Sequence, residues 1–159
     1  MASQADTMKS YDCLAVFADT AKPCKGEFHI DVYRNGTHVD SFGDHNLVVE
    51  AGRIRLAELA SGLSTDCISQ IGVGDGAEPE KDTDTALSNQ MLFPLDKASV
   101  TGRDARFDFS IDNTQANGLK IHEFGLFCKD GTMFSHRVRK GIIEKEDDIQ
   151  IRGYWILHF

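Results

Sequence analysis

The last eleven residues of the chain, IQIRGYWILHF, constrain its fold more than any other segment. They hold the longest alternation of apolar and polar residues in the sequence, and a period of two is that of a β-strand with one buried face. Because an unpaired apolar strand invites association, we expect this segment to be paired in a sheet, within its own chain or a neighbour's. The apolar set is Ile149, Ile151, Trp155, Leu157 and Phe159, and the opposite set is Gln150, Arg152, Tyr154 and His158.

A hairpin is predicted near the start of the chain. The segment EFHIDVY alternates, with Phe28, Ile30 and Val32 on one face. It is followed by Asn35-Gly36, a strong hairpin-turn signal because both residues accept positive φ. The segment HVDSF then supplies the return strand.

One helix is predicted, in DHNLVVEAGRIRLAELASGL. We place it at about residues 48–61, with Asp44 or Asn46 capping its start. Gly62 stands where a left-handed residue commonly ends a helix. The apolar residues at helical spacing, expected to face the core, are Leu47, Ala51, Ile54 and Leu59.

After the helix the sequence indicates β-structure. CISQIGV reads as an apolar strand, KASVTGRDARFDFSID as two strands about Gly102, and LKIHEFGLFCKDGTMFSHRVR as a second hairpin turning at residues 129–131. Between them, TDTALSNQM is expected to make one short helical turn capped by Thr83 or Asp84. GIIEKEDD is expected to connect the second hairpin to the last strand.

These segments predict a mainly β fold: an antiparallel β-sandwich or open barrel with one α-helix packed on it. No βαβ pattern is present, so mainly antiparallel pairing is expected. The 159 residues suit a single domain. We expect residues 1–26 to be a flexible N-terminal arm or docking segment and residues 27–159 to be one β-rich structural domain.

The charge of the chain limits the classes of partner that we expect it to bind. The formal net charge is −8 and the pI is about 5.1. A nucleic-acid binder needs a basic face to release counterions, so we expect no nucleic-acid partner. No segment approaches the roughly 18 apolar residues of a membrane span, and the N-terminus lacks a secretory signal pattern, so no membrane insertion is expected.

The cysteines and histidines give no strong metal signal. The four cysteines form no C-x-x-C pair, and Cys67 and Cys128 are expected to be small core residues. A disulfide between Cys13 and Cys24 stays open as an alternative. The six histidines are scattered, with one alternative, a metal site shared by His122 and His136 across the second hairpin.

The stretch IGVGDGAEPEKDTDTAL resembles a ligand loop but lacks the features of one. No Lys-Ser/Thr follows Gly76, and acidic residues with Pro79 disfavour a phosphate. The EF-hand order for calcium is absent. We therefore expect a solvated acidic loop between a core strand ending at Ile71 and Val73 and a return to the core at Leu87. No catalytic constellation stands out in the whole sequence, and we expect no enzyme activity, cofactor or metal.

Four segments together resemble a family of tail-fibre and tail-associated structural proteins of tailed bacteriophages. They are NGTHVDSFGDHNLVVEAGRIRLAELASG, ISQIGVGDGAEPEKDTDTALSN, ANGLKIHEFGLFCKDGTMFSHRV and GIIEKEDDIQIRGYWILHF. The second is similar to the family's I-x-x-I-G-x-G…D-T-A-L-x-N segment, and the third to its E-x-G-L-F-x-x-D-G-T hairpin. The resemblance covers residues 27–159, in this order and at these spacings.

The resemblance implies a virion structural protein of the tail, assembled in the host cytoplasm. Such modules attach fibres to a baseplate or collar, and the fibres are commonly homotrimers. We therefore expect a homo-oligomer with other tail subunits as partners. Family fibres continue into a shaft, whereas this chain stops at Phe159, which suggests a short adaptor or a fibre with a separate distal protein.

Candidate interface residues and two other function classes accompany this interpretation. Exposed aromatic, arginine and acidic positions suit subunit contacts, and the candidates are Arg137, Arg139, Tyr154, Asp75 and Glu78. A carbohydrate-binding β-sandwich involved in host recognition is the first alternative. A small enzyme, such as a metal-dependent hydrolase, is the second.

Overall fold

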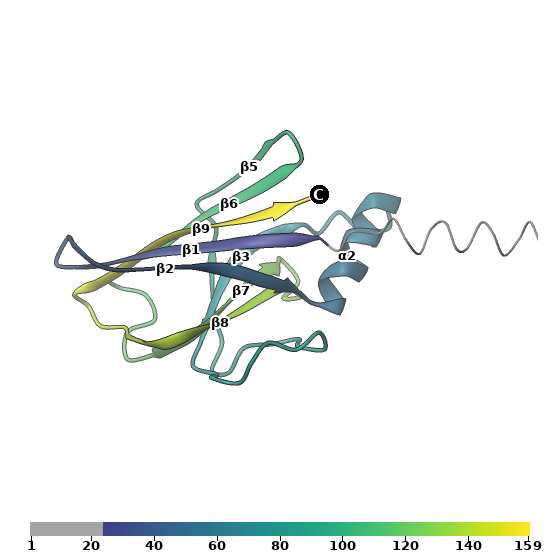
Figure 1. Cartoon of the computed structure of the whole chain (residues 1–159). Coiled ribbons are helices and arrows are strands. Elements are labelled where there is room, and N and C mark those ends of the chain that lie inside the picture. Colours follow the sequence, from purple (N-terminus) through teal and green to yellow (C-terminus); the bar gives the residue numbers. More distant parts are fainter. Residues whose placement is uncertain (1–23) are drawn as a thin grey trace, which may run out of the picture.

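The computed structural model describes residues 24–159, which form nine strands and one helix (Figure 1). All nine strands belong to one sheet in the order β4-β3-β7-β8-β2-β1-β9-β6-β5, and every neighbouring pair is antiparallel. The elements are β1 (Lys25–Arg34), β2 (Thr37–Val48), α2 (Glu50–Ser61), β3 (Ile68–Gly74), β4 (Met91–Pro94), β5 (Lys97–Thr101), β6 (Asp104–Ile111), β7 (Lys120–Cys128), β8 (Met133–Glu144) and β9 (Ile149–His158).

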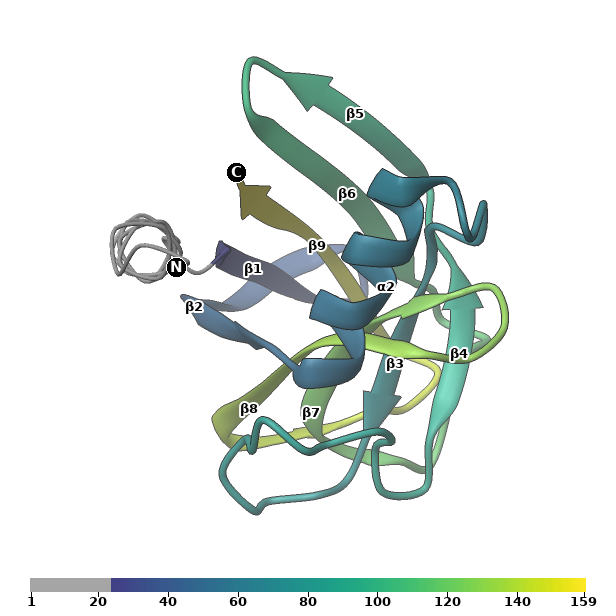
Figure 2. The same ribbon diagram turned by 90° about the vertical axis from the view of Figure 1, so that its right-hand side faces the viewer.

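The sheet curls into a half-barrel around a single main core. Phe28 on β1 and Phe124 on β7 are separated by two strands in the sheet order, yet their ring centroids lie 4.9 Å apart. Only a curled sheet brings these positions together. Trp155 of β9 packs edge-on against Phe28 at 4.8 Å. Helix α2 lies across one end of the curled sheet (Figure 2), and the predicted mainly β fold with one packed helix is confirmed.

The last strand behaves largely as its alternation predicts. β9 pairs with β1 on one side and β6 on the other, within the same chain. Ile149, Ile151, Trp155 and Leu157 are buried. Phe159 is the exception: it follows the last paired residue of the strand and is 51% exposed.

The helix is shorter than predicted and buries different residues. It begins at Glu50 after Val49, whose backbone is extended, because β2 continues to Val48 through pairing with β8. Asp44 and Asn46 therefore lie in a strand, and the predicted cap is wrong. Ile54 is 54% exposed, whereas Gly52 and Arg55 are the buried positions of the helix. The helix ends as predicted, at Gly62 with φ 75°.

Gly52 and Arg55 explain why the helix packs this way. A Cβ at Gly52 would overlap the backbone carbonyl of Phe134, so glycine permits direct contact between helix and β8. The Arg55 guanidinium donates to Asp66 (Nη1–Oδ2 3.0 Å) and to Asp130 (Nη2–Oδ2 2.6 Å). Asp130 lies in the turn between β7 and β8, so Arg55 ties the helix to that turn.

Several loop predictions need correction. Residues 83–87 form no helical turn; Asp84 instead accepts from the N–H of Lys81 (2.7 Å). β4 was not predicted, and β8 extends to Glu144, so residues 141–144 belong to a strand and not to a connector. The turns at residues 35–36, 102 and 129–131 are confirmed.

The cysteine prediction is half right. Cys128 is buried, and burial raises the pKa of its thiol to about 11, whereas Cys67 is exposed. Cys13 lies outside the described residues, as does most of the predicted arm, although β1 already begins at Lys25. No helix within residues 24–159 is long and apolar enough to cross a membrane.

Candidate assembly interface

Two adjacent strands of the sheet separate along most of their length. β1 and β2 are paired over nine residues, but β2 and β8 share only the pairs Leu47–His136 and Val48–Ser135. Beyond these, residues 37–46 of β2 and 137–144 of β8 have no backbone partner on their facing edges within the part of the chain that the structure describes. We call this region the β2–β8 seam. An unpaired strand edge is a template for another chain.

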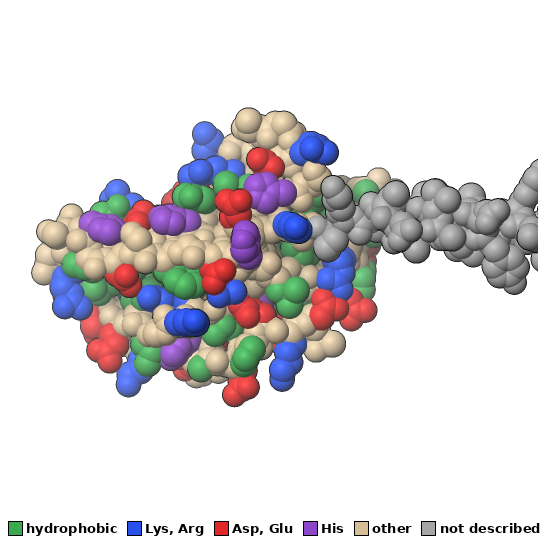
Figure 3. Space-filling model, in the orientation of Figure 1, with side chains coloured by type: hydrophobic (Ala, Val, Ile, Leu, Met, Phe, Trp, Pro, Cys, Tyr) green, Lys and Arg blue, Asp and Glu red, His purple; other side chains and the backbone are tan. Residues whose placement is uncertain are grey.

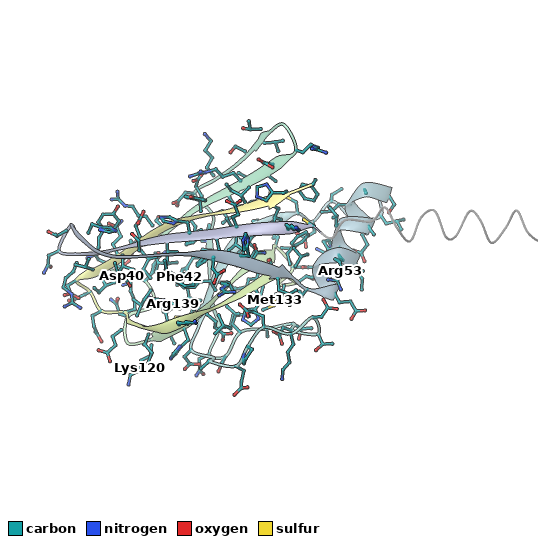
Figure 4. All side chains as sticks on the ribbon, in the orientation of Figure 1. Asp40, Phe42, Arg53, Lys120, Met133 and Arg139 are labelled. Carbon is teal, nitrogen blue, oxygen red and sulfur yellow. The ribbon has the colours of Figure 1, made fainter. Side chains whose placement is uncertain are left out.

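Side chains bridge the seam near its paired end. Arg137 forms an ion pair with Asp44, and Arg139 Nη2 lies 3.1 Å from Asp40 Oδ2. Both guanidinium groups lie over the ring of Phe42, at 5.8 and 5.5 Å from its centroid. Figure 4 shows Asp40, Phe42 and Arg139 between the two strands. The strands are thus held together here by side chains instead of a hydrogen-bond ladder.

Arg139 has more donors than the described residues use. Its side chain is 8% exposed, yet its Nε and Nη1 have no hydrogen-bond partner within residues 24–159. The Nε of Arg137 is in the same situation. A buried donor without a partner is costly, so these nitrogens mark a site that favours an added acceptor such as a carbonyl or a carboxylate.

A cavity lies between β1, β2, β8 and the start of β9. Its volume is about 360 Å³, and it reaches from the exposed rim to the buried side chain of Val32. Val39 on β2 and Ile142 on β8 stand on the rim and are 54% and 48% exposed. The lining residues are Val32, Arg34, Val39, Asp40, Ile142, Ile143, Glu144 and Ile149.

The acidic loop after β3 is fastened to the β7–β8 hairpin by a buried carboxylate. Glu123 Oε1 accepts from the N–H groups of Gly76 (3.0 Å) and Ser88 (2.7 Å). Its Oε2 lies 2.7 Å from His136 Nε2, and His136 Nδ1 lies 2.8 Å from Asp84 Oδ2. Two hydrogen-bonded carboxylates therefore hold both nitrogens of the imidazole. We call these three side chains the Glu123–His136–Asp84 latch.

The latch sets the charge state of His136. Burial disfavours the imidazolium, while the hydrogen bonds and negative charges of Glu123 and Asp84 favour it. The net result is a pKa above the usual value of a histidine. Because both ring nitrogens contact carboxylates, the alternative metal site of His122 and His136 would require breaking the latch. Among the described residues, no group of three or more His, Cys, Asp and Glu side chains is arranged to hold a metal ion.

The expectation of a fully solvated acidic loop is only partly correct. Glu80 is mostly buried, accepts from the Val138 N–H (2.7 Å) and lies 3.2 Å from Arg137 Nη1. Leu87 returns to the core as predicted. The loop therefore forms one wall beside β8, next to the seam.

The predicted interface residues fall into three places. Arg137 and Arg139 lie together in the seam. Asp75 accepts from Asn89 Nδ2 (2.7 Å), and Glu78 is exposed at the outside of the loop. Tyr154 lies apart on the outer face of the sheet, where its ring contacts His29 and the guanidinium of Arg106.

Other seam residues were not predicted from the sequence. Val39, Asp40 and Phe42 fall in the predicted return strand of the first hairpin, and Ile142 falls in the predicted connector. A usable signal was the polar content of THVDSFGDH, because charged residues along a strand commonly protect an open edge.

The visible surface around β1 and β2 carries mixed charge. Acidic, basic and histidine side chains are interspersed there, without a large patch of one sign (Figure 3). The exposed large apolar residues of the described chain are spread over several elements: Val39 and Ile142 line the cavity of the seam, and the others are Ile54, Leu63, Met91, Val100 and Phe159. Exposed apolar groups are typical of contact surfaces when they lie together.

The fold and the seam define the chain as a mainly β protein with one half-barrel sheet, in which β2 and β8 leave most of their facing edges unpaired. Comparison with protein-family models, curated proteins and solved structures gives no significant match.

Proposed function

We propose that the chain is a structural subunit of a bacteriophage tail that acts as a fibre, baseplate or collar assembly module. The sequence support is the order and spacing of four segments that resemble tail-fibre and tail-associated proteins. All four segments supply parts of the seam or the latch: the first contains β2, the second the acidic loop, the third the first half of β8, and the fourth the last four residues of β8.

The single observation that carries an assembly role is the β2–β8 seam. A monomeric protein normally covers or blunts its strand edges. Here two unpaired edges face each other beside a cavity lined by valine, isoleucine and charged residues, and Arg139 is nearly buried with unused donors. An added polypeptide supplies backbone partners for the edges, apolar side chains for the cavity and acceptors for the arginine.

Other tail subunits, including further copies of this chain, are the proposed partners. Backbone pairing supplies affinity in such contacts, and side-chain pockets supply selectivity. The carbohydrate-binding alternative gains no support from the aromatic residues: Trp155 is buried, and the Tyr154 ring is engaged by Arg106 and His29.

Electron microscopy of intact particles tests the proposal. We expect density for this chain at fixed positions in the tail, at a copy number that matches the local symmetry. Antibodies against the chain should label tails and not heads. Particles without the chain in any tail component would overturn the proposal.

A further inference from the structure

We propose that the β2–β8 seam receives an extended segment, residues 11–19, from a neighbouring copy of the chain. This inference deepens the assembly role proposed above and rests on it. The segment reads YDCLAVFAD and precedes the residues that the structure describes.

The backbone of the seam fits an added strand. In a β-strand, successive residues direct their N–H and C=O groups alternately to the two sides. About half of residues 37–46 therefore face the seam without backbone partners in residues 24–159. Across the seam, β8 bulges between Val138 and Ile143, where Gly141 has φ 81°. The regular unpaired edge is that of β2, and a strand paired along it has the geometry of strand addition to a sheet.

The cavity fits the apolar side chains of this segment. Leu14 and Val16 are two residues apart, so they lie on the same face when the segment is extended. The cavity of about 360 Å³ is lined by five valine and isoleucine residues. Among them, Val39 and Ile142 are exposed and Val32 is buried. Placing Leu14 and Val16 there removes exposed apolar surface on both partners.

The unused arginine donors fit the acceptors that the segment brings. Every residue of an added strand carries a carbonyl oxygen, and Asp12 and Asp19 add a carboxylate at each end. Nε and Nη1 of Arg139 have no partner in the described structure. A charge-assisted hydrogen bond to either kind of acceptor is stronger than a neutral one.

Chain reach indicates that the segment comes from another copy. The cavity lies at the Arg34 end of β1, and the chain enters β1 at Lys25, at the opposite end. Val16 precedes Lys25 by nine residues, a reach of about 30 Å, which is no more than the length of β1. β2 also lies between β1 and the seam, so the same copy has no length left to cross it.

The donor segment and the seam are different surfaces, so the contact is heterologous. Each copy gives its segment to one neighbour and receives one from another. Such contacts close into a ring when the rotation allows it and form an open filament when it does not.

Two full-length double variants and a control test the contact. The segment variant carries Leu14→Asp and Val16→Asp; the seam variant carries Val39→Asp and Ile142→Asp. Val100→Asp is the control, because Val100 is an exposed valine on the outer strand β5, away from the seam. Near-UV circular dichroism establishes that each protein is folded, and native mass spectrometry measures its mass.

The expected result is specific to strand exchange. Wild type and the Val100→Asp control form the same oligomer, and each double variant alone is a monomer. A 1:1 mixture of the two double variants forms a heterodimer, because one retains an intact seam and the other an intact segment. Hydrogen exchange at the seam-facing amides of residues 39–45 is slow in the wild-type oligomer and at least tenfold faster in the segment variant.

Three results would overturn the inference. If both double variants keep the wild-type oligomer, the assembly role stands and this contact is wrong. If the wild type is a monomer with slow exchange at residues 39–45 that the segment variant loses, the segment binds within its own copy. If the wild type is a monomer, and the backbone amides of the seam exchange fast both in that monomer and in intact particles, no segment occupies the seam.

Discussion

Glu123 and His136 face each other across β7 and β8, with Oε2 and Nε2 2.7 Å apart and both side chains almost completely buried. The second oxygen of the same carboxylate holds the N–H groups of Gly76 and Ser88. One buried carboxylate thereby fixes both ends of the acidic loop, and the loop in turn supports β8 through Glu80. The latch therefore holds the acidic loop, and the loop contacts β8, which is one of the two strands of the seam.

Replacing Glu123 with alanine should be strongly destabilising. The change leaves His136 and two loop amides without their acceptor in a buried site, and breaking a buried pair costs about 3–5 kcal/mol. Urea denaturation measures the free energy of unfolding. Glu78→Ala is the matched control, because Glu78 is exposed on the same loop, and its effect should stay within about 0.5 kcal/mol. Equal effects of the two changes would show that the latch contributes nothing.

The latch should weaken as the pH rises. The pKa of His136 in the folded protein is above that of an unfolded histidine, about 6.5. Its stabilising contribution is therefore fully present below pH 6.5 and is lost as the pH passes through the folded pKa. The difference in unfolding free energy between wild type and His136→Gln should shrink from pH 5.5 to pH 8.5. A difference that is constant or grows would contradict the ion-paired imidazolium.

Gly52→Ala should destabilise the protein although alanine is the better helix former. In an exposed helix position, alanine gains about 1 kcal/mol over glycine. At Gly52 the added methyl group meets the Phe134 carbonyl, so we expect a net loss of about 1–3 kcal/mol. Ala57→Gly, at an exposed position of the same helix, reports propensity alone. A stabilised Gly52→Ala protein would mean that helix and β8 do not touch there.

Arg55→Ala should loosen the end of the β7–β8 hairpin. Arg55 is the common partner of Asp66, Asp130 and Glu58, and its charge and hydrogen bond hold the pKa of Asp130 below the usual range. Removing it should cost about 2–4 kcal/mol. Arg34→Ala is the control, since the Arg34–Asp148 pair is largely exposed and such pairs contribute about 1 kcal/mol or less. Chemical denaturation measures the loss of unfolding free energy in both variants. Equal losses would show that Arg55 contributes no more than an exposed charge.

Much of the fold could be predicted because strand period and turn chemistry are local properties. The alternation of β9 and the turn at Asn35-Gly36 needed no knowledge of distant residues. The start of the helix could not be predicted, because β2 continues to Val48 by pairing with β8. The partner of Val48 is Ser135, which lies 87 residues further along the chain. The buried face of the helix was also missed, because glycine and arginine do not register as apolar positions.

The candidate site was predicted in part. Arg137 and Arg139 were chosen as contact residues and do lie together in the seam. Their partners Asp40 and Asp44 were missed because the pairing depends on how far β2 and β8 diverge. Divergence of two strands is a property of the curled sheet, and no single segment of the sequence encodes it.

We propose that this chain works as an assembled subunit, and its mass in solution reports directly whether it assembles. Sedimentation equilibrium across a hundredfold range of concentration should give a mass that is a whole multiple of the 17.6 kDa chain, with three copies expected. A mass of one chain at every concentration, together with its absence from tail fractions of intact particles, would contradict the account.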